Sequence, residues 1–170
     1  MDGILHAVAE HEVYTFLDGF SGHNQTKMHP DDQEKTTLMT EWGDFVAVVM
    51  MFGLKTTPTT FQRIIMEIFG EYIMMFMQVF LHHFVVYNRN MEHLHHLQLC
   101  LEKCQTTRLS LNPAKCAFRV THEALLGHIV SKEGIVVDPD KVMAILQELA
   151  LTNAKALISL NITLDFYILA

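Results

Sequence analysis

Two adjacent histidines, His82 and His83, interrupt an otherwise apolar run of the chain, FLHHFVVY. A neutral imidazole nitrogen is a ligand suited to zinc, copper, nickel or iron. Adjacent residues of a strand point to opposite faces, so neighbouring histidines bind one ion only where a turn relaxes that arrangement. Structural or surface histidines are therefore the favoured interpretation of the pair, and a transition-metal site is the remote alternative.

Two further groups of polar residues could do chemistry. His93 and His96 lie on one face of a predicted helix, where a surface or structural role is the favoured interpretation. Asp31 and Asp32 form a carboxylate pair in MHPDDQEK, which is typical of a solvated turn. The sequence contains no nucleophile motif of the G-x-S-x-G kind. None of these residues indicates a catalytic centre by its spacing.

The histidine pair must be positioned by the elements around it. Two apolar runs flank the pair, a pattern that predicts a tight hairpin with His82 and His83 at its tip. Upstream, Val13 to Asp18 predicts a strand that ends at an acid, and a second hairpin is predicted around a bend at Gly43-Asp44. Short strands are predicted downstream within KCAFRV and LLGHIVSKEGIVV.

Helices are predicted between these strands. The first begins at Thr57-Pro58 and carries an apolar stripe of Phe61, Ile64, Ile65, Ile68, Phe69, Tyr72, Ile73 and Phe76. The second runs from about Asn90 to Arg108, the third is capped by Asp138, and Thr152-Asn153 could cap a fourth. Hairpins that alternate with single helices predict an α+β fold, with helices packed on one face of an antiparallel sheet.

Composition limits the classes of function. The 170 residues are 50% hydrophobic and 18% charged, enough for the core of one domain or slightly more. The formal net charge of −7 argues against binding of nucleic-acid phosphates through overall electrostatic attraction. The three cysteines contain no CxxC pair, which argues against a disulfide framework and a strong zinc signature.

The N-terminal stretch has neither a basic n-region nor a long apolar h-region, so no signal peptide is predicted. The longest strictly apolar run, residues 45–54, is far shorter than the roughly 20 residues that span a bilayer. We therefore expect an intracellular protein, cytoplasmic or nuclear, with no membrane partner.

Several segments of the chain resemble the reverse transcriptases of gypsy-type LTR retrotransposons. They are FLDGFSGHNQTKMHPDDQEKTTLMTEWGDF, MMFGLKTTPTTFQR, LNPAKCAF, LLGHIVSKEGIVVDPDKV and TNAKALISL, and the resemblance as a whole covers the chain from about Met1 to Tyr167. The resemblance implies the palm of a right-handed polymerase in residues 1–109. It also implies the end of the palm and a junction hairpin to the thumb in 110–150, and the truncated start of the thumb in 151–170.

In that family, three acids hold two magnesium ions, which activate the primer hydroxyl and stabilise the leaving pyrophosphate. By position, Asp18 matches the first acid and is the expected metal ligand. The adjacent Asp-Asp pair of the family falls on His82 and His83. We therefore expect that Mg²⁺ is not bound productively by this chain.

The resemblance also implies nucleotide-binding positions. His23 stands where the family has an aromatic residue that senses the sugar, Phe52 and Gly53 belong to FGLK beside the nucleotide, and Gln62 belongs to the following helix. Met51 replaces the proline that normally precedes Phe52. These departures place nucleotide selection in doubt.

The resemblance implies an RNA/DNA primer–template as the family's partner. We expect weak or no binding here, because fingers, complete thumb, RNase H and integrase regions are not expected in this chain. The predicted function is a reverse transcriptase-like fragment, a pseudoenzyme related to RNA-directed DNA polymerases. The alternatives are an active polymerase palm that works with other segments and, more remotely, a histidine-based transition-metal-binding protein.

Overall fold

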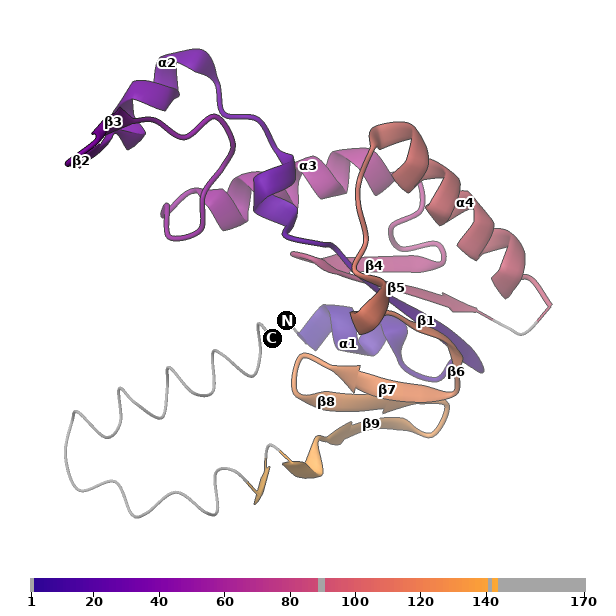
Figure 1. The fold of residues 1–170 in the computed structure, drawn as a ribbon. Helices are drawn as coiled ribbons and strands as arrows, with labels where there is room; N and C mark the ends of the chain where they lie inside the picture. The colour runs from indigo at the N-terminus through magenta and orange to yellow at the C-terminus, as the bar shows by residue number, and fades with distance from the viewer. Residues whose placement is uncertain (1, 89–90, 141, 144–170) are drawn as a thin grey trace.

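The computed structural model describes residues 2–88, 91–140 and 142–143, and these fold around a four-stranded sheet of order β4-β5-β1-β6 (Figure 1). The strands are β1 (Val13–Asp18), β4 (Met77–Phe80), β5 (His83–Asn88) and β6 (Ala117–Val120). All neighbouring strands run antiparallel. Strand β1 pairs with β5 along its whole length, which sets Asp18 directly opposite His83.

Two helices, α3 (Thr57–Phe69) and α4 (His93–Thr107), cover one face of this sheet. Phe61, Ile65 and Phe69 of α3 pack against Leu17 and Phe84 of the central strands. Cys100 and Cys104 of α4 belong to the same core, so these cysteines are packing residues. The α+β architecture with helices on an antiparallel sheet is confirmed.

The opposite face is covered by α1 (Asp2–Val8) and by a three-stranded antiparallel sheet of β7 (His122–Leu125), β8 (His128–Ser131) and β9 (Gly134–Val137). Val8, Tyr14, Val85 and Val130 meet in this second core. Neither α1 nor the start of β7 was predicted from the sequence. Side chains of β1 and β5 therefore enter two cores in alternation, which agrees with strands that are apolar throughout.

A small subregion extends away from the central sheet (Figure 1). It contains the short helices η1 (Gly22–Gln25), α2 (Pro30–Gln33) and η2 (Glu34–Thr36), and the hairpin of β2 (Leu38–Thr40) and β3 (Gly43–Phe45). The predicted hairpin is present, but its bend lies at Glu41 and Trp42 rather than at Gly43-Asp44. Gly43 opens β3 with a φ of 124°, a conformation that favours glycine.

The predicted first helix is too long. Helix α3 ends at Phe69, and the backbone N–H groups of Tyr72 and Ile73 both donate to the Phe69 carbonyl in the turn that follows. Tyr72, Ile73 and Phe76 still pack into or against the α3–α4 core. The apolar period continues because the turn keeps these side chains inward, although the backbone is no longer helical.

The later helices agree in part with the sequence. Helix α4 begins at His93 rather than near Asn90, and it ends where Arg108 adopts a left-handed conformation with a φ of 58°. The segment after Asp138 is helical as far as it is described, but the predicted helix at Thr152-Asn153 and the thumb segment 151–170 lie outside the described residues. Within the described part of the chain, every helix is too short or too polar to cross a membrane.

Candidate functional site

A two-residue turn of Leu81 and His82 joins β4 to β5, because Phe80 pairs directly with His83. His82 lies in the turn as predicted, whereas His83 is the first residue of β5 rather than a turn residue. Leu81 accepts the left-handed conformation that the turn requires, with a φ of 53°. The centroids of the two imidazole rings lie 4.2 Å apart. Adjacent residues of a strand point their side chains to opposite faces. Because His82 lies in the turn, its ring can instead lie beside that of His83.

Gln62 supports this hairpin from helix α3. Its side-chain oxygen accepts a hydrogen bond from the Leu81 backbone N–H, and its Nε2 donates to the Val79 carbonyl at 3.4 Å. Both ends of the amide are therefore used by the hairpin. The family resemblance assigned Gln62 to the nucleotide, which stays a prediction, and in the structure its amide holds the turn that carries the two histidines.

Asp18 meets the two histidines at the end of β1. Its Oδ1 lies 3.5 Å from Nδ1 of His83 and 3.7 Å from Nε2 of His82. Both distances exceed the range of a hydrogen bond. The Asp18 side chain is only 7% exposed, and Oδ1 has no hydrogen-bond partner among the described residues. The structure therefore brings together the predicted metal ligand and the two residues at the family's other acid positions.

The backbone around Asp18 is held by segments far apart in the sequence. The Asn112 N–H donates to the Asp18 carbonyl at 2.7 Å, and the Gly19 N–H donates to the His82 carbonyl at 2.8 Å. Cys116 Sγ accepts from the Asp18 N–H at 3.4 Å. Asn112 and Cys116 flank the short helix η3 (Pro113–Lys115). Sequence reasoning gave these residues no role, although they belong to the LNPAKCAF segment that carries part of the resemblance.

Burial controls the charge of the site. It raises the pKa of the Asp18 carboxyl, and the nearby His82 and Lys115 partly oppose this rise. Burial lowers the pKa of His83 to about 4, assisted by the positive charges of His82 and Lys115. His83 is therefore a neutral imidazole at pH 7, with a nitrogen lone pair in place of the family's negative charge.

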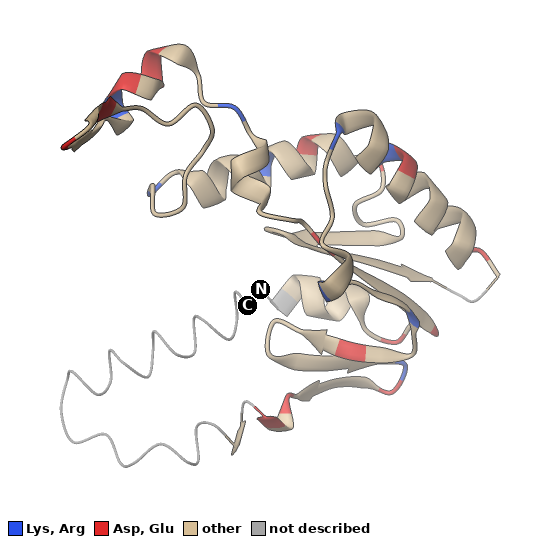
Figure 2. Cartoon of the chain, in the orientation of Figure 1, with Lys and Arg blue, Asp and Glu red and all other residues tan. Residues whose placement is uncertain are grey.

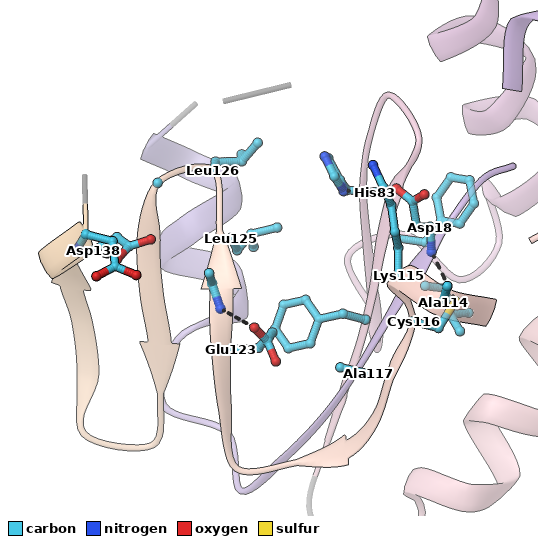
Figure 3. A pocket seen from close by; sticks show the side chains of 16 residues that line it. Asp18, His83, Ala114, Lys115, Cys116, Ala117, Glu123, Leu125, Leu126 and Asp138 are labelled. Carbon is cyan, nitrogen blue, oxygen red and sulfur yellow. Dashed lines mark hydrogen bonds and ion pairs between the residues drawn. The ribbon is translucent and has the colours of Figure 1, made fainter. Parts of the chain in front are cut away.

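Two cavities adjoin the site. The larger has a volume of about 600 Å³ and is lined by Asp18, His83 and Lys115 on one side and by Glu123 and Asp138 on the other (Figure 3). The smaller has a volume of about 380 Å³ and is lined by residues that include Asp18, His82, His23, Phe52 and Lys115. Asp18 lines both cavities, so the carboxylate lies at the boundary between them.

Only some of the predicted nucleotide-binding residues line the same cavity. His23 and Phe52 line the smaller cavity, whereas Gly53 is not among its lining residues. The His23 ring stands edge-on to Phe61 at 5.3 Å, and burial followed by the charge of His82 lowers the pKa of His23. A Cβ on Gly22 would lie 2.4 Å from the Phe61 ring, so this approach of η1 to α3 requires glycine.

The donor set does not fit a pair of magnesium ions. Mg²⁺ prefers carboxylate, phosphate and water oxygens, and this site presents one carboxylate and two imidazoles. The Lys115 side chain, which also lines both cavities, adds a positive charge near the single carboxylate. Figure 2 shows the Lys and Arg positions of the described chain spread over several elements of the ribbon. The arrangement is better suited to a borderline transition metal.

Comparison with known proteins gives consistent results. The family described as reverse transcriptase (RNA-dependent DNA polymerase) matches residues 2–141. The chain is 33% identical over 146 residues to the Retrovirus-related Pol polyprotein from transposon 297 of Drosophila melanogaster, covering 85% of this chain and 14% of that protein. The corresponding polyprotein from transposon gypsy of the same organism is 29% identical over 143 residues, covering 84% of this chain and 14% of its own length.

The fold is similar to that of solved viral enzymes. The foamy viral protease-reverse transcriptase in complex with an RNA/DNA hybrid matches with a TM-score of 0.83 at 17% identity, covering 95% of this chain and 22% of that chain. The same viral protein in complex with dsDNA matches with a TM-score of 0.82 at 17% identity, covering 97% and 34%. These likenesses confirm the predicted polymerase palm-like fold.

Proposed function

Because this chain belongs to the reverse transcriptase (RNA-dependent DNA polymerase) family and its relatives are transposon Pol polyproteins, we propose that it is a reverse transcriptase-like retrotransposon domain that has lost nucleotidyl transfer. One observation carries the proposal: the Asp18 carboxylate faces His82 and His83, at 3.7 and 3.5 Å, instead of further carboxylates. The palm geometry is retained, and the chemistry of its donors has changed.

Charge is the first physical reason for the loss. Two-metal phosphoryl transfer needs cations about 3.5–4 Å apart, each stabilised by negative oxygen ligands. A single buried carboxylate, Asp18, would face two ions that together carry four positive charges. His83 adds no negative charge, because an imidazole is either neutral or cationic, and burial lowers its pKa to about 4, so it is neutral at pH 7. The repulsion between two adjacent dications would therefore be largely uncompensated.

Ligand geometry is the second reason. A carboxylate can bridge two metals through its two oxygens, whereas a neutral imidazole offers one acceptor nitrogen. His82 and His83 therefore cannot replace bridging acids. Further carboxylates would be needed to hold the ion that activates the attacking hydroxyl, and among the described residues Asp18 supplies the single carboxylate of the Asp18–His82–His83 cluster.

Nucleic-acid binding is proposed to be weak for a related reason. The net charge is −7, and no two Lys or Arg residues are adjacent in the sequence. Neutralisation of phosphates by clustered basic residues dominates nucleic-acid affinity. The chain spans 14% of the curated relatives named above, so the activities of those whole polyproteins are not assigned to it.

Primer extension tests the proposed loss of activity. The full chain and Asp18→Ala are incubated with a primed RNA template and deoxynucleotides, with Mg²⁺ or Mn²⁺, beside a reverse transcriptase of known activity. We expect incorporation by the two chains to be indistinguishable, because the native site already lacks a working metal pair. Incorporation by the native chain that is clearly above Asp18→Ala would overturn the proposal.

Restoring the acids separates the metal site from the rest of the catalytic cycle. We expect the double variant His82→Asp and His83→Asp to bind Mn²⁺ more tightly than the native chain, as measured by calorimetry, because two further carboxylates join Asp18. Adding Asp18→Asn to this variant should weaken the gained binding. Binding of Mn²⁺ that is equal in the native and doubly restored chains would contradict the role assigned to the histidines.

A further inference from the structure

Three potential metal ligands converge at the end of β1. The Asp18 carboxylate and one nitrogen from each of His82 and His83 all lie within 4.8 Å of one another. Two imidazoles and one carboxylate form a donor set that proteins use for zinc and for non-haem iron. We propose that these three residues form a binding site for one divalent transition-metal ion, with zinc as its defining probe. This site is independent of whether the chain retains polymerase activity.

The spacing of the donors suits a shared ion better than direct contact. Zinc binds histidine nitrogen and carboxylate oxygen at about 2.0–2.1 Å, so neighbouring ligands of a tetrahedral ion lie about 3.3 Å apart. The observed separations of 3.5 and 3.7 Å from Asp18 Oδ1 are slightly longer than this value. Small side-chain rotations would bring the donors to zinc, whereas the direct contacts are too long for hydrogen bonds.

The Asp18 carboxylate has a buried oxygen, Oδ1, without a hydrogen-bond partner among the described residues, and a bound cation would act as its partner. A buried acceptor without a partner is costly, and the cost is greater for an ionised group. Coordination to a metal would satisfy this atom. The same atom is the one that faces both histidines.

The donors are carried by a rigid scaffold. Asp18 and His83 are opposing residues of a continuous antiparallel pair. His82 is held through its carbonyl by the Gly19 N–H, and the turn is held by Gln62. Ligands that are positioned by regular structure lose little freedom on binding, which favours metal affinity.

The surroundings favour a transition metal over magnesium. Lys115 lines both adjoining cavities, so electrostatic attraction at Asp18 is reduced for any dication. Magnesium affinity depends on oxygen ligands and net negative charge, whereas zinc gains affinity from its bonds to imidazole. An ion can approach through the larger cavity, where Glu123, Asp138 and Asp140 line the wall (Figure 3). Three protein ligands leave a fourth position for water.

Calorimetric titration with zinc tests the proposal on the full chain, first stripped of metal by a chelator. We expect one high-affinity event per chain, weakened by about tenfold or more in Asp18→Asn, His82→Ala and His83→Ala, because each change removes a ligand. The matched control is His95→Ala, since His95 is an exposed histidine of helix α4 outside the cluster. This control should retain the native affinity.

Cobalt substitution provides a readout that a merely structural effect does not mimic. Four-coordinate Co²⁺ absorbs strongly in the visible, so the native chain should develop this band and Asp18→Asn should show a weaker, altered band. Asp18→Asn is nearly isosteric, and its circular dichroism in chelator should match that of the native chain. This comparison keeps the test valid even where a histidine variant is poorly folded.

Two results would overturn the site. Zinc affinity that is unchanged in all three ligand variants would assign binding to other histidines or cysteines. Displacement of zinc by an equal concentration of Mg²⁺ would show a site dominated by carboxylate oxygens. Neither result depends on primer extension, so failure of the zinc site is distinguishable from failure of the proposed loss of polymerase activity.

Discussion

Strand β1 faces histidines at two places, one buried and one partly exposed, and the two contacts differ in kind. In the middle of the strand, Thr15 Oγ1 lies 2.8 Å from Nε2 of His93, the first residue of helix α4. At its end, Asp18 faces His82 and His83 at 3.7 and 3.5 Å. His93 has a neutral partner at hydrogen-bonding distance, whereas the other pair faces a carboxylate from outside that distance. Burial alone therefore does not identify a functional histidine.

The surroundings of the two places explain this difference. His93 is 1% exposed and is closed off by the packing of α4 on the sheet, and the Arg119 N–H also donates to Thr15 Oγ1. The histidines of the β4–β5 hairpin, in contrast, border two cavities. The comparison indicates that His93 stabilises the fold, whereas His82 and His83 are accessible to a ligand.

Removing each histidine side chain would test this comparison most strongly. We expect His93→Ala to lower the free energy of unfolding by about 2–4 kcal/mol, since it leaves a cavity and removes a buried hydrogen bond. His82→Ala, at a 23% exposed side chain, should cost less than about 1 kcal/mol in the presence of a chelator. Urea denaturation measures both values. Equal losses would show that the two places do not differ in their structural role.

The sequence predicted the elements around the site better than the contacts within it. The strand ending at Asp18 and the hairpin carrying His82 and His83 follow from local apolar patterns and turn spacing. Their meeting depends on the register between β1 and β5, which local pattern does not determine. The family resemblance, in contrast, predicted that Asp18 lies near His82 and His83, because they occupy the positions of the family's three metal-binding acids. It assigned no role to Lys115, which lines both cavities from the short helix η3.

The errors in the fold have a common physical cause. Helix α3 was extended to Phe76 because an apolar period of helical spacing continues after Phe69, although a turn can keep side chains in the core equally well. Helix α1 was missed because its seven residues are too few to show a helical period, and it is stabilised by tertiary contacts of Leu5 and Val8. In both cases packing, rather than local pattern, decided the backbone conformation.

The hydrogen bonds from Gln62 to the β4–β5 hairpin allow a second, smaller test of the difference between the hairpin histidines and His93. We expect Gln62→Ala to lower the free energy of unfolding by about 1–2 kcal/mol, because the Leu81 N–H and the Val79 carbonyl lose their partner. Zinc affinity should fall as the histidines lose their fixed orientation, whereas the His93 environment should be unaffected. Urea denaturation and zinc calorimetry are the two measurements.

Gln98→Ala is the matched control for this change. Gln98 is exposed on α4 and donates to Glu102 at 2.7 Å, so its loss should alter stability by less than about 0.5 kcal/mol and leave zinc affinity unchanged. If Gln62→Ala behaves like this control in both measurements, the hairpin does not depend on Gln62 and the proposed support is wrong.

The pH dependence of stability gives the smallest and most specific test, because a single group is responsible. Burial, with smaller contributions from His96 and Arg119, lowers the pKa of His93 below its ordinary value of 6.5. Between the folded and unfolded pKa values, the unfolded chain binds more protons, so the contribution of His93 to stability is full above pH 6.5 and is lost as the pH falls towards the folded pKa. In His93→Gln, which can still bond to Thr15 but does not titrate, this loss should disappear. The shifts of Asp18 and His83 are common to both chains, so the difference between their stability–pH curves isolates His93. Parallel curves would show that His93 does not carry this buried, neutral role, and the contrast with the hairpin histidines would then rest on accessibility alone.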